Sequence, residues 1–395
     1  MLEAGQAEIE AVSNVIASGQ LFRYREESEC DRFERRYAEA LGVHHVILCS
    51  SGTTALTAAL AGLDIGPGDE VLVPAHTYMA SALAVLAVGA IPVVVDIDDS
   101  ITMDPDAAEA AVGPHTRAVM PVHMWGAVCN MDALLHVAAA HDLAVVEDAC
   151  QCVGGSYRDR PAGSMGDASA VSFNYFKNMT CGEGGAVITR SEKVAERASC
   201  MIDPCRFYWQ GRETSPKPFA HPGARASELQ GAMLNVQLDR LPTLIASLRA
   251  LKTEILSETA DIGLGRVPRH SPGGECATTV MYRLPSAEAA EHFSESAGGT
   301  VLMNTGRHTY TEWDPVLNKR GAHHPDLDPF RLTANAACRT EYSRDMCQRS
   351  LAILARTVSI GLKPGMASAE RTALIERIRK AGADALSWKG ETGMS

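Results

Sequence analysis

Short apolar runs alternate with helical patterns through the first half of the chain. Seven runs bounded by turn residues predict strands, and the first six begin roughly 21 to 27 residues apart. These runs lack alternating polar residues, which is typical of strands covered on both faces. The predicted strands are residues 45–50, 70–74, 91–96, 118–123, 144–148, 170–173 and 185–189.

Helical patterns fill the gaps between these runs, over residues 54–61, 80–87, 105–111 and 131–140. Strand, helix and strand in this order predict an α/β fold with a mostly parallel seven-stranded sheet flanked by helices. Only about a dozen residues separate the last two runs, which is too short for a helical crossover. We therefore expect the last strand to be antiparallel, with the glycines of residues 182–185 forming its turn.

The second half of the chain begins with a polar and aromatic loop, residues 203–222, followed by a long helical pattern, residues 226–260. A loop of this length inside a compact protein is usually functional or mobile. We place a domain boundary near the middle of the long helix. It separates a large domain, residues 1–240, from a smaller C-terminal α+β domain, residues 241–395.

Composition and charge narrow the functional classes. The net charge of −12 argues against nucleic-acid binding, which needs a basic face. No apolar run approaches the length of a membrane helix, and the N-terminus lacks the pattern of a signal peptide. Eleven cysteines without CxxC pairs fit a reducing compartment better than a disulfide framework. We expect a cytoplasmic protein with no membrane partner and, since no cysteine or histidine spacing suits a metal, no metal site.

Lys177 and Asp148 are the leading candidates for chemistry. Lys177 follows an apolar strand and precedes a glycine-rich turn, and Asp148 ends another strand. Ligands of open α/β sheets bind beyond the carboxyl ends of the strands. A lysine and an aspartate there suit pyridoxal 5'-phosphate (PLP), where the lysine forms a Schiff base and the aspartate keeps the pyridine nitrogen protonated. Taken singly, a surface lysine and a helix-capping aspartate explain the same residues.

Other residues at strand ends could complete such a site. Gly52, Thr53 and Thr54 begin a helix and could cradle a phosphate, although an ordinary N-cap explains them too. Tyr78 could stack on a cofactor ring, or be a buried tyrosine with a satisfied hydroxyl. Side-chain alternation should turn Glu147 to the opposite face. Among the remaining candidates, His123 is better explained as a core histidine, Gln151 could bond to the ring hydroxyl, and Ser172 could bond to the phosphate.

Five motifs in order give the chain its resemblance to a known family. They are residues 51–56 (SGTTAL), 77–78 (TY), 147–151 (EDACQ), 172–177 (SFNYFK) and 182–185 (GEGG). On these motifs the chain resembles the DegT/DnrJ/EryC1/StrS family of sugar aminotransferases, which are fold type I PLP-dependent transferases.

The resemblance implies a cofactor, a set of roles and an assembly. It implies Lys177 as the Schiff-base lysine and Asp148 as the partner of the pyridine nitrogen. The family works as a homodimer with active sites at the subunit interface. The remaining implied roles are Thr53, Thr54 and Ser172 on the phosphate, Tyr78 stacked on the ring, and Gln151 near the ring hydroxyl.

Two positions bear on the branch. The dehydratase branch carries histidine where this chain has Lys177, so the resemblance favours a transaminase. The family often places an asparagine that reaches the phosphate in the neighbouring subunit, and this chain has Gly223 there. Residues 21–24 and 355–359 look most like the branch of the 8-amino-3,8-dideoxy-octulosonate transaminase.

The leading hypothesis is a PLP-dependent aminotransferase. It would move an amino group from L-glutamate or L-glutamine to a keto or aldehyde sugar or a cyclitol, in antibiotic or polysaccharide biosynthesis. The alternatives are a PLP-dependent dehydratase, an aminoshikimate-type enzyme on the same fold, and a non-catalytic sensor of PLP or amino-sugar metabolites. Aromatic residues of 207–209 and 307–313 are candidates for the acceptor pocket.

Overall fold

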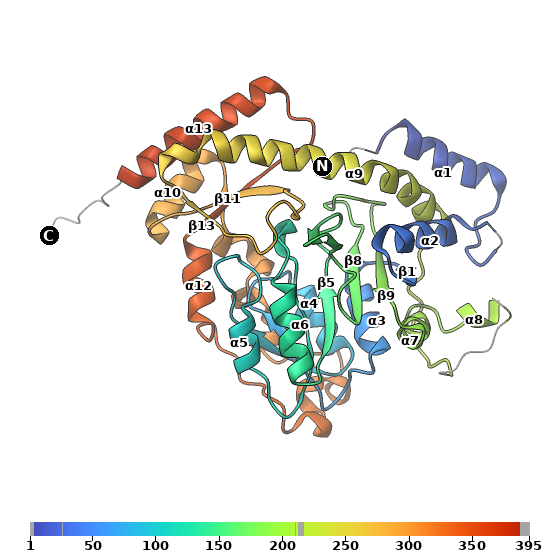
Figure 1. Ribbon diagram of the computed structural model, residues 1–395. Helices are drawn as coiled ribbons and strands as arrows, with labels where there is room; N and C mark the ends of the chain where they lie inside the picture. The colour runs from blue at the N-terminus through green and yellow to red at the C-terminus, as the bar shows by residue number, and fades with distance from the viewer. Residues whose placement is uncertain (1–3, 26, 210, 212–216, 388–395) are drawn as a thin grey trace.

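The computed structural model describes residues 4–25, 27–209, 211 and 217–387 (Figure 1). Its main feature is a seven-stranded sheet with the strand order β1-β9-β8-β5-β4-β2-β3. All of its pairings are parallel except those of β9, which runs antiparallel to both β1 and β8. The strands are β1 His45–Cys49, β2 Glu70–Pro74, β3 Ile91–Val95, β4 Thr116–Val119, β5 Ala144–Asp148, β8 Ala168–Ser172 and β9 Gly185–Thr189.

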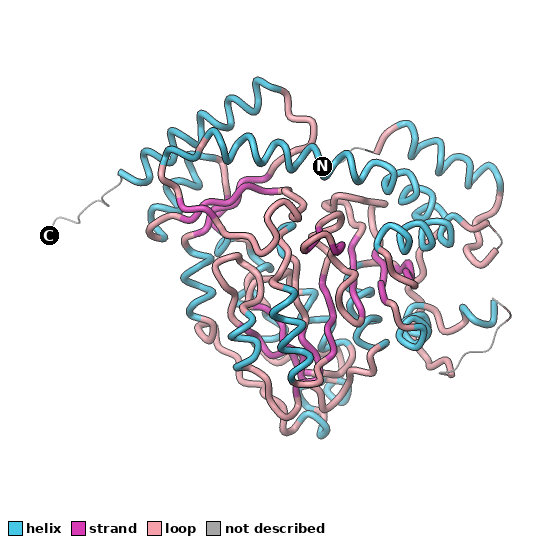
Figure 2. Tube along the Cα trace, viewed as in Figure 1, coloured by secondary structure: helices cyan, strands magenta, loops and turns pink. Residues whose placement is uncertain are grey.

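Helices cover both faces of this sheet (Figure 2). Successive strand residues alternate between two apolar clusters, so that Val46 and Leu48 face one layer while Ile47 and Cys49 face the other. The first layer contains α2 Glu29–Leu41, α5 Pro105–Ala110, α6 Met131–Ala140 and α9 Glu228–Glu258. The second layer contains α3 Gly52–Gly62, α4 Ala80–Ala87 and α7 Glu192–Ile202.

The α/β fold class, the seven strands and the antiparallel last strand are confirmed. The predicted strand 118–123 was wrong at both ends, because β4 runs from Thr116 to Val119. Pro121 follows and has no backbone N–H to continue a ladder. Its carbonyl instead accepts the N–H of Asp148 at 2.9 Å. The chain after β4 is thereby tied to the end of β5.

A second sheet has four antiparallel strands in the order β10-β11-β13-β12. Helices α10 and α13 pack against each other beside it (Figure 1). The 31-residue helix α9 contacts β11 and α13 at one end and α1 and α2 at the other. The bounds are α1 Gln6–Ser18, β10 Gly265–Arg266, β11 Thr279–Arg283, α10 Ala287–Ala297, β12 Thr300–Val301, α12 Gln348–Ala355, β13 Thr357–Gly361 and α13 Ser368–Ser387.

The segment between the second sheet's strands, residues 306–347, returns to the large sheet. It includes α11 Asp314–Leu317 and several short 3-10 turns. Tyr310 and Trp313 are fully buried in the cluster of the second layer, and Tyr342 donates a hydrogen bond of 2.7 Å to the carbonyl of Pro92. Thr309 forms an isolated bridge with His76, just beyond β2. This return places residue 308 at the carboxyl edge of the sheet.

The predicted 203–222 loop contains a short helix, α8 Arg206–Trp209, and residues 210 and 212–216 lie outside the described part of the chain. A small hairpin, β6 Ser156–Tyr157 with β7 Arg160–Pro161, follows β5. Within the described ranges, no helix is both long and apolar enough to cross a membrane.

Candidate active site

Two adjoining cavities lie at the carboxyl edge of the large sheet. The large cavity has a volume of about 610 Å³ and the small cavity about 280 Å³. Strand ends β2, β5 and β8 all contribute, as expected where parallel strands finish at one edge. The residues that line both cavities are Tyr78, Cys150, Gln151, Asn174 and Lys177.

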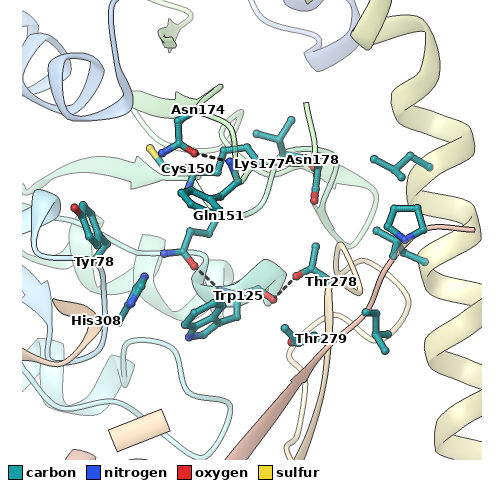
Figure 3. Close-up of a pocket in the computed structure, with 17 residues that line it drawn as sticks. Tyr78, Trp125, Cys150, Gln151, Asn174, Lys177, Asn178, Thr278, Thr279 and His308 are labelled. Carbon is teal, nitrogen blue, oxygen red and sulfur yellow. Dashed lines mark hydrogen bonds between the residues drawn. The ribbon is translucent and has the colours of Figure 1, made fainter. Parts of the chain in front are cut away.

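Lys177 lies in the loop that joins β8 to the antiparallel strand β9. The ends of this loop are held by hydrogen bonds from Phe173 N to Gly184 O at 2.8 Å and from Cys181 N to Phe173 O at 3.0 Å. The backbone N–H of Lys177 donates to Asn174 O at 3.0 Å (Figure 3). Its amine has no hydrogen-bond or ion-pair partner in the described parts of the chain. A half-buried amine lining two cavities is available to a ligand.

Asp148 is held at the end of β5 and lines the small cavity. Only 4% of its surface is exposed. Its Oδ2 accepts a hydrogen bond from Ser81 Oγ at 2.7 Å, and its Oδ1 accepts one from Cys150 N at 3.1 Å. Burial, reinforced by the Asp148 charge, raises the pKa of the Cys150 thiol well above its ordinary value, so this cysteine stays a neutral thiol.

Glu147 points away from the cavities, as alternation predicted. It is fully buried and accepts hydrogen bonds from Gly163 N at 2.9 Å and from Met165 N and Gly166 N at 2.6 Å each. His123 Nε2 lies 2.9 Å from its Oε2, and His123 Nδ1 accepts the N–H of Cys129. The interpretation of His123 as a core histidine is confirmed, and Glu147 serves the fold.

The turn between β1 and α3 forms one end of the small cavity. Ser51 caps α3 by accepting Thr54 N at 3.1 Å, while Gly52 and Thr53 line the cavity together with Ser172. A Cβ on Gly52 would lie 2.7 Å from Ser172 Cβ, and a Cβ on Gly185 would lie 2.5 Å from Ser51 O. Both glycines therefore let backbones approach closely around the start of a helix, which favours anions.

Thr54 is the one predicted site residue outside the cavity lining. Its hydroxyl lies 3.0 Å from Ser51 Oγ and 3.3 Å from Ser50 Oγ. The structure thus brings the other seven predicted residues together around the two cavities. Thr54 lies next to Ser51 and does not line either cavity. The seven are Gly52, Thr53, Tyr78, Asp148, Gln151, Ser172 and Lys177.

Trp125 and His308 form an aromatic side of the large cavity next to Tyr78 (Figure 3). The ring centroids of Trp125 and His308 are 4.8 Å apart, and those of Tyr78 and His308 are 5.4 Å apart. Trp125 has the left-handed backbone angles φ 53° and ψ 31°. Strained residues of this kind persist where several contacts fix them.

Three hydrogen bonds, each to a different residue, fix Trp125. Its N–H donates to Gln151 Oε1 at 3.3 Å, its carbonyl accepts Thr278 Oγ1 at 3.2 Å, and its indole N–H donates to His76 Nε2 at 3.0 Å. Burial, with a smaller effect from His308, lowers the pKa of His76 to about 3. His76 is therefore neutral and can accept the indole proton.

His308 is also held in a neutral form. Its Nδ1 lies 3.1 Å from the carbonyl of Thr305, which assigns the ring proton to Nδ1. Burial lowers the pKa of His308, and the positive charges of Lys177 and Arg307 act in the same direction. The Nε2 atom is left as a hydrogen-bond acceptor beside the cavity.

The two aromatic segments that were predicted to line the acceptor pocket lie in different places. From residues 307–313, only His308 lines the large cavity, whereas Tyr310 and Trp313 are fully buried core residues. From residues 207–209, no side chain lines either cavity of its own chain: Phe207 is buried, and Tyr208 and Trp209 are exposed. The expectation that Phe207, Tyr208 and Trp209 line the pocket is therefore wrong for the cavities of this chain.

Several residues that line the large cavity were not predicted from the sequence. Trp125 follows a strand, as Tyr78 does, and that position was the available signal for it. Leu244 and Leu248 on α9, and Thr278 and Thr279 near β11, come from distant segments that no local pattern links to the site. In the described part of the chain, no group of three or more His, Cys, Asp or Glu side chains could hold a metal ion.

Comparison with known sequences gives one family over nearly the whole chain. The DegT/DnrJ/EryC1/StrS aminotransferase family matches residues 3–379. The chain is 42% identical over 221 residues to GDP-perosamine synthase of Caulobacter vibrioides, covering 54% of this chain and 57% of that protein. It is 36% identical over 355 residues, 82% of each chain, to L-glutamine:2-deoxy-scyllo-inosose aminotransferase of Streptoalloteichus tenebrarius.

A further relative is dTDP-3-amino-3,4,6-trideoxy-alpha-D-glucose transaminase of Streptomyces venezuelae, 40% identical over 65% of this chain and 66% of that one. The matches thus span less than two thirds of the perosamine synthase and of this transaminase.

Solved structures agree with the fold over almost the full length. An aminotransferase from Psychrobacter cryohalolentis aligns with a TM-score of 0.81 and 25% identity, covering 97% of this chain and 98% of its own. DesV of S. venezuelae, solved in complex with a ketimine intermediate, aligns with a TM-score of 0.74 and 31% identity, covering 95% and 94%. With its seven-stranded sheet, its lysine loop and its match over residues 3–379, the chain belongs to the DegT/DnrJ/EryC1/StrS aminotransferase family.

Proposed function

We propose that the protein is a PLP-dependent aminotransferase that moves an amino group from L-glutamate or L-glutamine to a keto or aldehyde carbon of a sugar or cyclitol. One observation carries this proposal. The amine of Lys177, which has no partner among the described residues, and the buried carboxylate of Asp148 line the same small cavity. A cavity with these two groups and a helix start suits PLP chemistry.

The residues of the small cavity fit the three polar parts of PLP. The helix start at Gly52 and Thr53, with the hydroxyl of Ser172, would hold the phosphate. Ser172 Oγ already accepts the N–H of Asn174 at 3.4 Å, so its hydroxyl proton is free to donate. Asp148 would face the ring nitrogen, and Lys177 would meet the aldehyde carbon.

When bound, PLP supplies a protonated pyridine ring that withdraws electrons from the carbon whose C–N bond changes. Asp148 keeps the proton on the ring nitrogen, because an ionised carboxylate favours a cationic neighbour. The Lys177 amine would take the Cα proton of the donor and would later return a proton to the acceptor carbon. Tyr78, which lines both cavities, would cover the ring and exclude water.

The relatives support the choice of substrates. The name of the Streptoalloteichus relative gives L-glutamine as donor and a cyclitol ketone as acceptor, and it matches 82% of this chain. Two other relatives are named for nucleotide-linked amino sugars. We infer a homodimer with shared sites and a role in antibiotic or polysaccharide biosynthesis. The cytoplasm suits eleven cysteines that are all free thiols.

The test is the visible absorption spectrum of purified protein with PLP, before and after L-glutamine or L-glutamate. Wild type should show a visible cofactor band that an amino donor removes. Lys177→Ala should show neither the band nor turnover. Lys193→Ala, which removes an exposed lysine of α7 away from both cavities, is the matched control and should behave as wild type.

Two outcomes would reject parts of this proposal. If the visible cofactor band is still present in Lys177→Ala, Lys177 is not the residue that binds the cofactor. A wild-type band that no amino donor alters removes the aminotransferase activity and leaves another PLP reaction on the same site.

A further inference from the structure

The side-chain amide of Gln151 has a fixed orientation where the two cavities adjoin. Gln151 lines both cavities. Its Oε1 accepts the backbone N–H of Trp125 at 3.3 Å, and no described residue bonds to its Nε2. A backbone N–H can pair only with the oxygen of an amide, so this contact turns the two N–H donors of Nε2 away from Trp125. In Figure 3 the amide nitrogen points towards Tyr78, which also lines both cavities.

The N–H that fixes this amide belongs to an unusual turn. Trp125 and Gly126 both have left-handed backbones, with φ of 53° and 80°. This conformation is unfavourable for tryptophan and persists only where other contacts hold it. A relaxed backbone at Trp125 would change the direction of its N–H relative to Gln151, and the amide would then be free to rotate.

The contacts that hold the turn come from a distant segment, residues 276–278. Thr278 Oγ1 donates to the carbonyl of Trp125 at 3.2 Å. The N–H of Cys276 donates to the carbonyl of Gly126 at 3.0 Å. A Cβ on Gly126 would lie 2.9 Å from Cys276 Cβ, so the segment packs closely on the turn. Two successive carbonyls of the turn are thus held by the C-terminal part of the chain.

The donor end of the Gln151 amide suits one atom of PLP, the ring oxygen next to the aldehyde carbon. N–H donors stabilise the ionised form of such an oxygen, whereas the oxygen of an amide would repel it. The family resemblance implies only that Gln151 lies near the ring hydroxyl. The bond from Trp125 adds which end of the amide is available to it.

We propose that Trp125 is a positioning residue: its left-handed turn, held by Thr278, keeps the N–H donors of Gln151 directed at the ring oxygen of PLP. This inference rests on the proposed PLP-dependent function and deepens it. A residue from the acceptor side of the large cavity, Thr278, thereby supports a contact in the cofactor site.

The test compares two cofactors in titrations of the full-length protein after its own cofactor has been removed. One is PLP and the other is 3-deoxypyridoxal 5'-phosphate, which lacks the ring hydroxyl. The readout is the preference for PLP, the dissociation constant of the analogue divided by that of PLP. General damage to the site weakens both ligands and leaves this ratio unchanged, so a change in the ratio reports the ring oxygen alone.

Variants of Gln151 test the contact itself. Gln151→Leu removes the amide and should lower the preference for PLP about tenfold, the effect of losing a hydrogen bond to a charged group. Gln151→Glu keeps an oxygen for the N–H of Trp125 but replaces the donor with a second oxygen. It should lower the preference at least as much as Gln151→Leu does.

Variants of Thr278 test the positioning role. Thr278→Val removes the hydrogen bond to Trp125 and should lower the preference about threefold, as expected for one neutral hydrogen bond. Thr278→Ser keeps the hydroxyl and should stay near wild type. Thr309→Val is the matched control, because it removes a buried hydroxyl that has no described partner and lines neither cavity. It should leave the preference unchanged.

The possible failures can be told apart. Absence of a visible cofactor band in wild type with PLP rejects the proposed function itself. A normal band with an unchanged preference in Gln151→Leu overturns the contact with the ring oxygen. A preference that rises in Gln151→Glu overturns the orientation of the amide. A lower preference in Gln151→Leu with no change in Thr278→Val overturns the positioning role of the turn.

Discussion

Ser81 on helix α4 donates a hydrogen bond of 2.7 Å to Oδ2 of Asp148 at the end of strand β5. A second hydroxyl, Thr77 Oγ1, lies 2.7 Å from Ser81 Oγ. The carboxylate proposed to face the cofactor is thus oriented by a side chain from the neighbouring strand–helix unit. Positioning of this kind is what functional sites require of the residues behind them.

Ser81→Ala should lower kcat about tenfold while leaving the fold intact. A hydrogen bond to a charged group contributes about 1.5–3 kcal/mol, and its loss lets the Asp148 carboxylate rotate. Steady-state kinetics and thermal unfolding check this. Thr77→Val, which spares the bond from Ser81 to Asp148, should have a smaller effect. Equal losses in the two variants would contradict the orienting role of Ser81.

Asp148→Asn and Glu147→Gln should separate catalysis from stability. Asp148→Asn keeps the shape but removes the charge that holds a proton on the ring nitrogen, so kcat should fall by more than tenfold with little change in Tm. Glu147→Gln disrupts a buried acceptor of three backbone N–H groups and His123, so Tm should fall while residual folded protein still binds PLP. A larger loss of kcat in Glu147→Gln and a larger loss of Tm in Asp148→Asn would contradict these assignments.

Glu147 should also make stability sensitive to acid. Burial opposes ionisation, but His123 and the backbone N–H groups outweigh it and hold the pKa of Glu147 below its ordinary value of 4.5. A depressed carboxyl pKa gives stability that is complete above about pH 4.5 and lost as the pH falls through the folded-state pKa. Urea unfolding from pH 7 to pH 3 should show a steeper loss below pH 4.5 in wild type than in Glu147→Gln. Parallel curves would refute the linkage.

Gly52→Ala and Gly223→Ala should differ sharply. A Cβ on Gly52 meets Ser172 Cβ at 2.7 Å and Cys150 Sγ at 2.9 Å, whereas a Cβ on Gly223 meets nothing within 4 Å. We expect Gly52→Ala to weaken PLP binding at least tenfold and Gly223→Ala to leave it unchanged, measured by cofactor titration.

The same titration applies to Gly223→Asn, which restores the family asparagine. The next residue, Ala224, accepts the N–H of Ser50 at 2.9 Å, next to the turn that begins α3. If the site is shared between subunits, Gly223→Asn should tighten PLP binding without changing Tm. A variant that loosens PLP binding would argue against that contact.

The sheet could be predicted because its physical signal is local. Parallel strands covered on both faces appear as continuous apolar runs, and the short link after β8 required an antiparallel return. The cofactor end of the site was also local, since Asp148 ends a strand and Gly52 and Lys177 each come soon after another strand of the same sheet. The domain boundary near residue 240 stays a prediction, because α9 passes through it without a break.

The acceptor side could not be predicted because it depends on contacts between distant segments. His308 reaches the sheet edge only through the return of residues 306–347, anchored by Tyr342 and Tyr310. The left-handed backbone of Trp125 leaves no trace in the sequence, since tryptophan has no preference for that conformation. Aromatic composition alone pointed equally to residues 207–209, which lie elsewhere.

The two cavities are lined largely by different parts of the chain. Every residue that lines only the small cavity lies between Ser51 and Glu183, while the far side of the large cavity is built from Leu244 to Pro364. Segments 276–279 and 361–364 could therefore be exchanged with those of a relative without altering a single residue of the cofactor cradle. Because the two sets of residues are separated along the chain, the part that would select the acceptor can be replaced without changing the cofactor site, provided that Thr278 is kept. Chimeric enzymes that combine one constant N-terminal half with different C-terminal halves are therefore a practical route to new amino sugars.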